Sequence, residues 1–299
     1  MGEIAAVATS FFWSLTSIQF TLAGRRVGSV VVNRVRLVLA ALYLSLAHLL
    51  LQGELWPTHA ESFRWGWLGL SGTLGLVLGD ASLFQAFLII GPRRAMVLMT
   101  LAPVISAVAA WGWLGEALHP AEVAAILLTV SGVAWVVSER GPSQTPGVSA
   151  QDTRRYAVGV LLGLGGATGQ ALGLVTSKHG LSGDFSPLSA TLIRMLVAST
   201  VIWLLTILRG QGNATLHALA DKKTRALIAG GALTGPFVGV WLSLVAVQRT
   251  QVGIASTLMA LSPLILIPLE RWIFKAQVSL RTITGTIVAL SGVAIIFLT

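Results

Sequence analysis

The 299-residue chain contains no cysteine. Disulfides, thiolate nucleophiles and cysteine-based metal sites are therefore excluded. Charged side chains are also scarce, at 10% of the residues, whereas soluble domains carry about a quarter. Because a soluble protein of this length needs far more charge to cover its surface, a water-soluble globule is excluded.

Hydrophobic residues are abundant: they make up 55% of the chain, and the mean hydropathy is +0.82. This content excludes intrinsic disorder, and the 32 glycines follow no triplet period, which excludes a collagen-like chain. The composition predicts an all-α polytopic membrane protein, because each helical span takes about 20 apolar residues. Ten such spans are expected at 4–23, 30–51, 65–90, 94–114, 120–138, 156–176, 187–208, 225–247, 252–273 and 279–298.

The two halves of the chain resemble each other. "LAP" at 101–103 and "SGVA" at 131–134 recur 160 residues later as "LSP" at 261–263 and "SGVA" at 291–294. Pairs of glycines recur at the same offset, Gly75 and Gly79 as Gly235 and Gly239, and "RLVLA" from Arg36 matches "RMLVA" from Arg194 at an offset of 158. One offset held across several spans indicates an internal repeat. We expect a first repeat at 1–140, a polar linker at 141–155 and a second repeat at 156–299.

Each repeat carries five predicted spans, an odd number. The second copy must therefore enter the bilayer in the opposite direction from the first. Inverted repeats are typical of secondary transporters, in which the substrate site lies near the membrane midplane between the halves. The sequence therefore predicts ten helices in two inverted five-helix repeats, with a site between the halves and transport by alternating access.

Basic residues are distributed unequally over the two sides of the predicted membrane. Of the 20 Lys and Arg residues, all but four fall on one side. The exceptions are Arg64, Lys178, Arg194 and Arg249. The positive-inside rule places the basic side in the cytoplasm and both chain termini outside. The basic residues stand singly or in pairs beside apolar runs, which is typical of membrane flanks rather than of a nucleic-acid surface.

Asp80 is the only aspartate inside a predicted span. An ionisable residue in lipid is costly and points to function, so Asp80 is a candidate site for a proton or a substrate amine. The alternative is a hydrated or paired carboxylate that only anchors helix ends. An aspartyl intramembrane protease is not expected, because its acid–base work requires a second aspartate in a neighbouring span.

Other sites of chemistry are not indicated by the sequence. None of the four lysines follows a glycine, so no P-loop is present and no nucleotide is expected. The five histidines lack metal-ligand spacing, and no GxSxG motif occurs. No cofactor is expected. Glu270 and Arg271 are adjacent near the end of a span, where they form either a gate or an interfacial anchor beside Trp272.

The segment 91–136 resembles the EamA repeat of the drug/metabolite transporter superfamily. The resemblance lies in "LAP" on an apolar helix, "LGE" at 114–116 and a closing helix with glycine. The second copy at 251–297 matches except that Lys275 and Ala276 replace the "GE". The resemblance covers nearly the whole chain. It implies a basket-like ten-helix carrier, similar to the aromatic amino-acid exporters, with both termini in the cytoplasm. Its central cavity would be lined mainly by spans one, three, four, six, eight and nine.

From the internal repeat and the resemblance to the EamA family, we expect the protein to export small metabolites, above all amino acids, across a bacterial-type inner membrane. The expected partners are a small-molecule substrate and the lipid bilayer, with protons as a candidate coupling ion. The substrate-binding residues expected are Trp13, Ser17, Asp80, Met96, Met99, Thr100, Gln170, Trp241, Ser256 and Met259. An importer, a broad drug-efflux protein, a passive channel and a membrane enzyme acting on lipid head groups are the alternatives.

Overall fold

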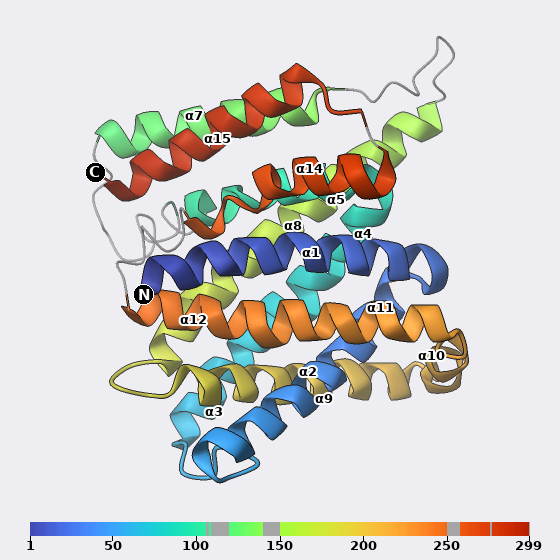
Figure 1. The fold of residues 1–299 in the computed structure, drawn as a ribbon, viewed down its shortest axis with the longest axis vertical. Coiled ribbons are helices and arrows are strands. Elements are labelled where there is room, and N and C mark those ends of the chain that lie inside the picture. The colour runs from blue at the N-terminus through green and yellow to red at the C-terminus, as the bar shows by residue number, and fades with distance from the viewer. Residues whose placement is uncertain (106–107, 109–119, 140–149, 250–257, 276, 299) are drawn as a thin grey trace.

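The computed structural model describes residues 1–105, 108, 120–139, 150–249, 258–275 and 277–298, and its elements there are all helical (Figure 1). The elements of the first half are α1 (Gly2–Val27), α2 (Ser29–Gln52), α3 (Ser62–Gly72), η1 (Thr73–Gly79), α4 (Asp80–Ile90), α5 (Pro92–Met99) and α7 (Pro120–Val137). Those of the second half are α8 (Ala150–Gly180), α9 (Pro187–Leu208), α10 (Gly212–Ala218), α11 (Lys222–Ala232), η2 (Leu233–Gly239), α12 (Val240–Arg249), α14 (Ser262–Phe274) and α15 (Leu280–Leu298).

Six continuous helical stretches in the described residues are long and apolar enough to cross a membrane. They are Gly2–Val27, Ser29–Gln52, Ser62–Ile90, Asp152–Gly180, Pro187–Leu208 and Lys222–Ala246. Two shorter apolar helices, Val123–Val137 and Leu280–Ile295, accompany them. The chain is thus a multi-pass membrane protein, and the number of ten spans stays a prediction.

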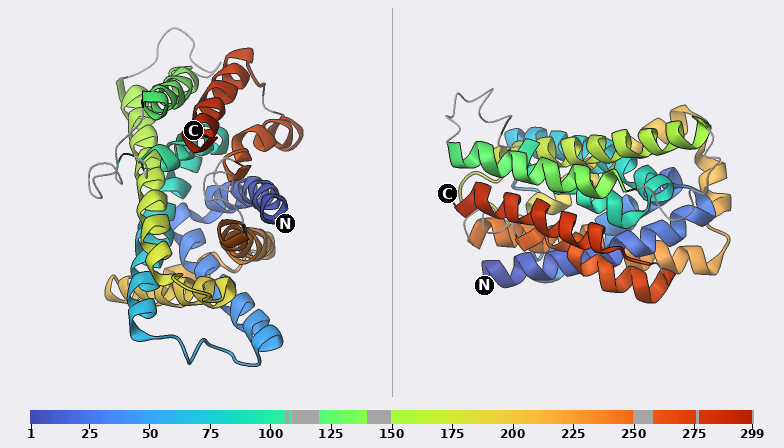
Figure 2. Two further views of the ribbon diagram at one scale, coloured as in Figure 1. Left: turned by 90° about the vertical axis from the view of Figure 1, so that its left-hand side faces the viewer. Right: turned by 90° about the horizontal axis from the view of Figure 1, so that it is seen from above.

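The repeat seen in the sequence reappears in the positions of the helices. η1 and η2 begin 160 residues apart and have equal lengths, α7 and α15 also begin 160 residues apart, and α2 and α9 begin 158 apart. Equivalent helices run in opposite directions: α1 runs from left to right in Figure 1, and α8 runs from right to left. α1 begins and α15 ends at the same end of the bundle (Figures 1 and 2). The described helices therefore have the arrangement expected of an inverted repeat.

The two halves exchange their first helices. α1 packs along α11, η2 and α12 of the second half, and α8 packs along α3, η1 and α4 of the first half. Glycines permit this close approach: a Cβ added at Gly169 would lie 2.5 Å from the Cα of Gly79, and one at Gly239 would lie 2.9 Å from the Trp13 ring. Small residues are expected where helices meet this closely in lipid. Because each of these helices packs on the other half, the two halves meet along the centre of the molecule.

The last described helices of the two halves, α7 and α15, form a pair at one edge of the bundle (Figure 2). A Cβ at Gly132 would lie 2.4 Å from the backbone N of Ala289, and a Cβ at Gly292 would lie 2.3 Å from Oγ1 of Thr129. Gly292 is equivalent to Gly132 and Ala289 to Thr129, so the same contact is made twice. Such a self-complementary contact is the signature of a two-fold relation.

Two helices that the sequence predicted as continuous are interrupted. α5 ends at Met99, and α14 begins only at Ser262, so Pro263 lies in a first helical turn instead of interrupting a span. A proline is tolerated there because its missing N–H would have no partner in any case. Serine hydroxyls attach the second break to α1: Ser262 donates to the carbonyl of Ser10 at 3.1 Å, and Ser14 donates to the carbonyl of Ser262 at 2.9 Å.

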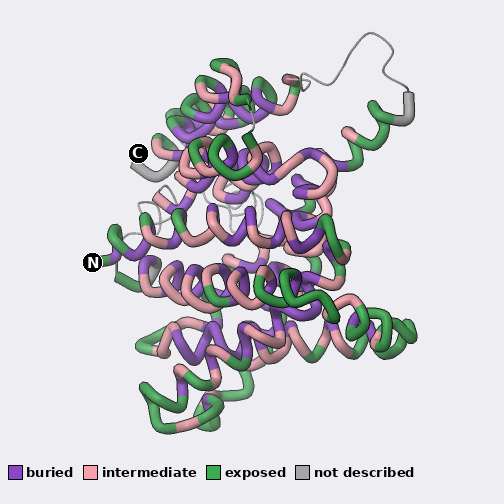
Figure 3. Tube along the Cα trace, turned by 45° about the vertical axis from the view of Figure 1, so that its right-hand side comes forward, coloured by how far each residue is buried: buried purple, intermediate pink, exposed green. Residues whose placement is uncertain are grey.

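The molecule is apolar inside and outside. Buried residues concentrate where helices face one another, and exposed ones follow the outer surfaces and the helix ends (Figure 3). Several large apolar side chains are nevertheless exposed on the helices, among them Leu42, Leu46, Leu50, Leu127, Leu161 and Ile207. An outer surface rich in leucine and isoleucine is stable in lipid rather than in water.

Candidate functional site

A cavity lies between the two halves at the centre of the bundle. It encloses about 920 Å³ of space free of atoms, its open mouth included. Residues from α1, α2, η1, α4, α5, α8, α9, η2 and α12 line it, together with Met259. The resemblance implied walls from spans one, three, four, six, eight and nine. The structure adds α2 and α9, the second helix of each half.

Most of the side chains expected at the site reach this cavity. Its walls include Trp13, Ser17, Asp80, Met96, Met99, Gln170 and Met259. Ser256 lies outside the described residues. Whether the wall residues bind substrate stays a prediction, because lining a cavity is not by itself evidence of binding.

Thr100 and Trp241 do not lie among the residues that line the cavity. Thr100 is buried at the break after α5, where its hydroxyl donates to the carbonyl of Val97 at 2.7 Å. Trp241 packs against the ring of Phe237 at 6.0 Å. The π-helical turn of η2 changes the register of the helix after it, so that Val240 and its neighbours on the next turn line the cavity.

Asp80 is paired with Arg36, so its carboxylate is paired, as in the second of the two alternatives, by a partner that the sequence did not identify. Its Oδ2 lies 2.5 Å from Nη2 of Arg36, whose side chain is 3% exposed. The guanidinium also donates from Nε to Oδ1 of Asn33 at 2.9 Å and from Nη2 to the carbonyl of Leu76 at 3.2 Å. Arg36 therefore donates to three acceptors, and the carboxylate is held by a buried cation.

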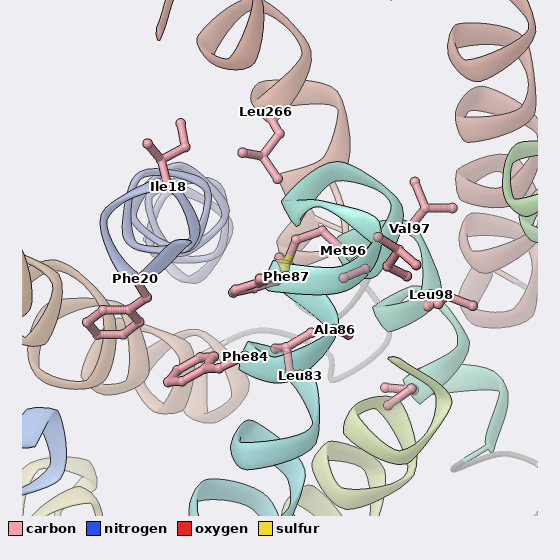
Figure 4. Packing of buried hydrophobic residues seen from close by; sticks show 14 of the residues in the cluster. Ile18, Phe20, Leu83, Phe84, Ala86, Phe87, Met96, Val97, Leu98 and Leu266 are labelled. Atoms are coloured by element: carbon pink, nitrogen blue, oxygen red, sulfur yellow. The ribbon is translucent and has the colours of Figure 1, made fainter. Parts of the chain in front are cut away.

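Aromatic rings complete the surroundings of Arg36. Its guanidinium carbon lies 4.7 Å from the centre of the Phe84 ring and 5.8 Å from that of Phe20. Figure 4 shows Phe20 from α1 turned toward Phe84 on α4, and the two ring centres are 5.0 Å apart. Phe87 stacks beside Phe84 at 5.7 Å. These rings form an apolar wall next to the ion pair.

The π-helix η1 explains how these groups are positioned. A π turn breaks the usual i→i−4 ladder and is frequent at functional sites. The side chain of Asn33 donates to the carbonyls of Leu76 and Val77, both at 3.3 Å, and Arg36 shares the first of them. Asp80 is the first residue after the π turn. The irregular turn thus supplies acceptors to α2 and directs the carboxylate toward the same arginine.

A second arginine, Arg194 on α9, lines the cavity and is 5% exposed. Its backbone is fixed against α3, because a Cβ added at Gly72 would lie 2.5 Å from the carbonyl oxygen of Arg194. Its buried Nε has no hydrogen-bond partner in the described part of the chain. Arg194 is the repeat equivalent of Arg36, yet it lacks the acceptors that Arg36 has.

Sequence reasoning missed both arginines as site residues, because it counted them among the charges that flank the membrane. The structure corrects this assignment: both lie inside helices and are buried. Without these two arginines, the side of the membrane with fewer basic residues still has only Arg64, Lys178 and Arg249. The unequal distribution of basic residues therefore remains. The signal that identifies them is the match between "RLVLA" and "RMLVA", in which an arginine recurs seven residues into an apolar helix.

Glu270 has a different partner from the one expected. It is 5% exposed, and its carboxylate accepts from the backbone N–H of Arg93 at 3.1 Å, with Nη1 of Arg93 at 3.6 Å. Arg271 is exposed, and Trp272 is 81% exposed. Glu270 therefore joins α14 to α5 across the two halves instead of anchoring the chain beside Trp272.

The chemistry of the cavity is that of a binding chamber. Two arginines and one aspartate are the charged residues of its described wall, beside aromatic rings and methionine side chains. No group of three or more His, Asp or Glu side chains that could hold a metal occurs among the described residues. The arrangement suits a solute with both a polar and an apolar part.

The comparisons with known proteins agree with this organisation. The profile of the EamA-like transporter family matches residues 1–138 and 157–298, that is, both halves. A solved structure described as "Crystal structure of protein" is 17% identical and covers 98% of this chain and 97% of its own, with a TM-score of 0.65, which shows the fold alone. No curated protein sequence matches the chain.

Proposed function

The chain belongs to the EamA-like transporter family, whose members are membrane transporters of the drug and metabolite type, and we propose on this basis that it exports small metabolites, above all neutral and aromatic amino acids. The observation that carries the proposal is the cavity between two inverted halves, where aromatic and thioether walls meet charged side chains. The chain acts in this proposal as a secondary transporter of a bacterial-type inner membrane.

Alternating access would follow from the pseudo-symmetry. Two inverted copies around one site have two similar packings, and rocking between them exposes the site to one side and then to the other. The contact between Arg93 and Glu270 joins α5 to α14 across the halves, so it would have to open in one of the two states. The helix breaks at Met99 and Ser262 lie beside cavity residues and would supply hinges there.

The central test is counterflow in liposomes that contain the purified protein. Saturable exchange of a labelled aromatic amino acid supports a carrier, and linear flux indicates a channel. Unchanged export of every amino acid by cells that overproduce the protein would count against the amino-acid assignment and favour broad drug efflux. Net accumulation into such cells would indicate an importer, and release of modified lipid would indicate an enzyme.

Two tryptophans provide a matched pair for this test. Trp13 lines the cavity, and Trp241 packs against Phe237 away from it. We expect Trp13→Ala to raise the KM for an aromatic amino acid about tenfold, equivalent to about 1.4 kcal/mol of lost binding. Trp241→Ala should leave the KM within about twofold. Equal effects of the two changes would remove the cavity from the transport path.

Proton coupling is assigned to Asp80 in this proposal. Because Arg36 holds the carboxylate, a proton can bind only when the pair loosens during the transport cycle. Asp80→Asn should therefore flatten the dependence of transport on external pH while some exchange remains. An Asp80→Asn variant with the unaltered pH profile would contradict the role.

The orientation of the chain can be measured directly. The positive-inside rule places both termini outside, and the family resemblance implies the opposite. Because the chain has no cysteine, a single cysteine introduced beside Arg26 or beside Arg64 can be labelled with a membrane-impermeant maleimide on intact cells without background. Labelling beside Arg64 and protection beside Arg26 are expected if the charge count is right.

A further inference from the structure

We propose that Arg194 binds the anionic group of the transported solute, and that the substrates are carboxylates with an apolar or aromatic body, whether or not they carry an amine. This inference rests on the carrier function proposed above and specifies its substrate class. It departs from the sequence interpretation, in which Asp80 held a substrate amine.

The first argument comes from the repeat. Around Arg36, three acceptors satisfy the guanidinium: a carboxylate, an amide oxygen and a carbonyl freed by the π turn. Around Arg194, Val240 occupies the position equivalent to the aspartate and Thr191 the position equivalent to the asparagine. The Thr191 hydroxyl donates to the carbonyl of Pro187 instead. The second-half arginine therefore has the position but not the partners of the first.

The second argument is energetic. A buried cation without acceptors is unfavourable, because neither water nor protein replaces its hydration. Arg194 is 5% exposed, and its buried Nε has no hydrogen-bond partner among the residues that the structure describes. A planar guanidinium binds a carboxylate through two parallel hydrogen bonds. An anion entering the cavity would supply what Asp80 supplies to Arg36.

The third argument is the space around Arg194. Gly75 has no side chain, and an added Cβ there would lie 3.6 Å from Nη2 of Arg194 and 3.8 Å from Oε1 of Gln170. The guanidinium and the amide thus face the same free volume above the η1 backbone. The rest of the cavity wall is largely apolar and includes Trp13, Phe84 and Met259. A carboxylate at Arg194 therefore leaves room for an apolar body toward the rings.

The fourth argument concerns charge. The carboxylate of Asp80 is paired through Oδ2 with Arg36 at 2.5 Å and is neutralised by it, so an amine at Asp80 would share the carboxylate with a buried guanidinium. With two arginines and one aspartate, the described wall carries one excess positive charge. Like charges in a low-dielectric cavity repel strongly. The cavity consequently favours anions and zwitterions over cations.

The experiment compares three ligands that differ only in their charged groups: tryptophan, indole-3-propionate and tryptamine. Their affinities are measured by competition against labelled tryptophan or labelled indole-3-propionate, with the full-length protein in liposomes. We expect the two carboxylates to bind within about threefold of each other and tryptamine to bind at least about tenfold more weakly. Tryptamine that binds as well as tryptophan would overturn the inference.

Substitutions at Arg194 and Val240 test whether carboxylate binding depends on Arg194. Arg194→Gln should lower the affinity for indole-3-propionate at least about tenfold, and Arg194→Lys should restore part of it. Val240→Asp places a carboxylate where the first half has Asp80. It should satisfy Arg194 internally, raise the melting temperature and weaken binding of carboxylates more than Val240→Asn, which is equal in size but uncharged.

The outcomes separate this inference from the proposed function. If indole-3-propionate is transported and depends on Arg194 while no amino acid is, the amino-acid assignment fails and the inference stands. If amino acids are exported equally well by the wild type and by Arg194→Gln, the export proposal stands and the inference fails. A Val240→Asp variant that binds indole-3-propionate as tightly as Val240→Asn would also refute the inference.

Discussion

Arg36 and Arg194 occupy equivalent points of α2 and α9, and the difference between their surroundings is the main asymmetry of the cavity. Arg36 is held by Asp80, by Asn33 and by a backbone carbonyl, whereas the buried Nε of Arg194 has no partner within the described chain. Duplication explains why both arginines are there. The later divergence of their neighbours explains why the acceptors around Arg36 have no counterparts at the equivalent positions around Arg194, which hold Val240 and Thr191.

The walls next to these arginines show the same divergence. In the first half, Gly79 on η1 meets another glycine, Gly169 of α8, whereas its equivalent Gly239 meets the Trp13 ring of α1. Only the second crossing brings an aromatic ring to the cavity.

The largest effect is expected when the two arginines are removed in turn. Arg36→Leu leaves Asp80 buried without its partner, which costs about 3–5 kcal/mol when a buried pair is broken. Arg194→Leu removes a buried charge that forms no ion pair with the described residues and whose Nε has no partner among them, so the loss of stability should be much smaller. Thermal unfolding of the purified protein in detergent measures both. Similar losses for the two variants would mean that the environments are not as different as the contacts indicate.

A smaller effect is expected from the α7–α15 pair, where the halves are alike. A methyl group at Gly132 would meet the backbone of α15, and one at Gly292 would meet Thr129 and the backbone of α7. Gly132→Ala and Gly292→Ala should therefore each cost about 1–3 kcal/mol, as overpacking does, and by similar amounts. Gly66→Ala is the control, since no atom lies within 4 Å of its added Cβ. If the unfolding free energies of Gly132→Ala and Gly292→Ala differ from each other by more than Gly66→Ala differs from the wild type, the two contacts are not equivalent and the two-fold relation is disproved.

The smallest effect concerns the starts of α3 and α11, whose preceding residues Glu61 and Asp221 are equivalent. The side chain of Asp221 caps α11 by accepting from two backbone N–H groups, and Glu61 makes no such bond. A hydrogen bond from the Thr224 hydroxyl, followed by these N–H groups and by Arg26, lowers the pKa of Asp221 to about 2. Asp221→Ala should lower the melting temperature by about 2 °C and Glu61→Ala by less.

The pH dependence of this difference has a fixed sign. Because the folded pKa of Asp221 lies below the unfolded value of about 3.9, its contribution is complete above that value and is lost as the pH falls toward 2. The gap between the wild type and Asp221→Ala should therefore close between about pH 4 and pH 2. A gap that stays constant over this range would show that the carboxylate does not act through its charge.

Much of the architecture could be predicted from the sequence, because apolar runs and a constant offset are properties of the chain alone. The prediction of a multi-pass helical membrane protein is confirmed. Seven of the ten expected site residues line the cavity. Thr100 and Trp241 do not line the cavity, because a helix break and a π turn change the register, and neither is visible in hydrophobic periodicity.

The sequence by itself determined that this chain is a membrane protein built from two related halves, because hydropathy and repeat spacing are properties of the linear sequence. Only the tertiary structure decided which charges meet. Arg36 and Asp80 are 44 residues apart, and Arg194 reaches the same cavity from the other half. Electrostatic pairing depends on distance and burial in space, so packing decides that Arg36 forms an ion pair with Asp80 while Nε of Arg194 has no partner among the described residues.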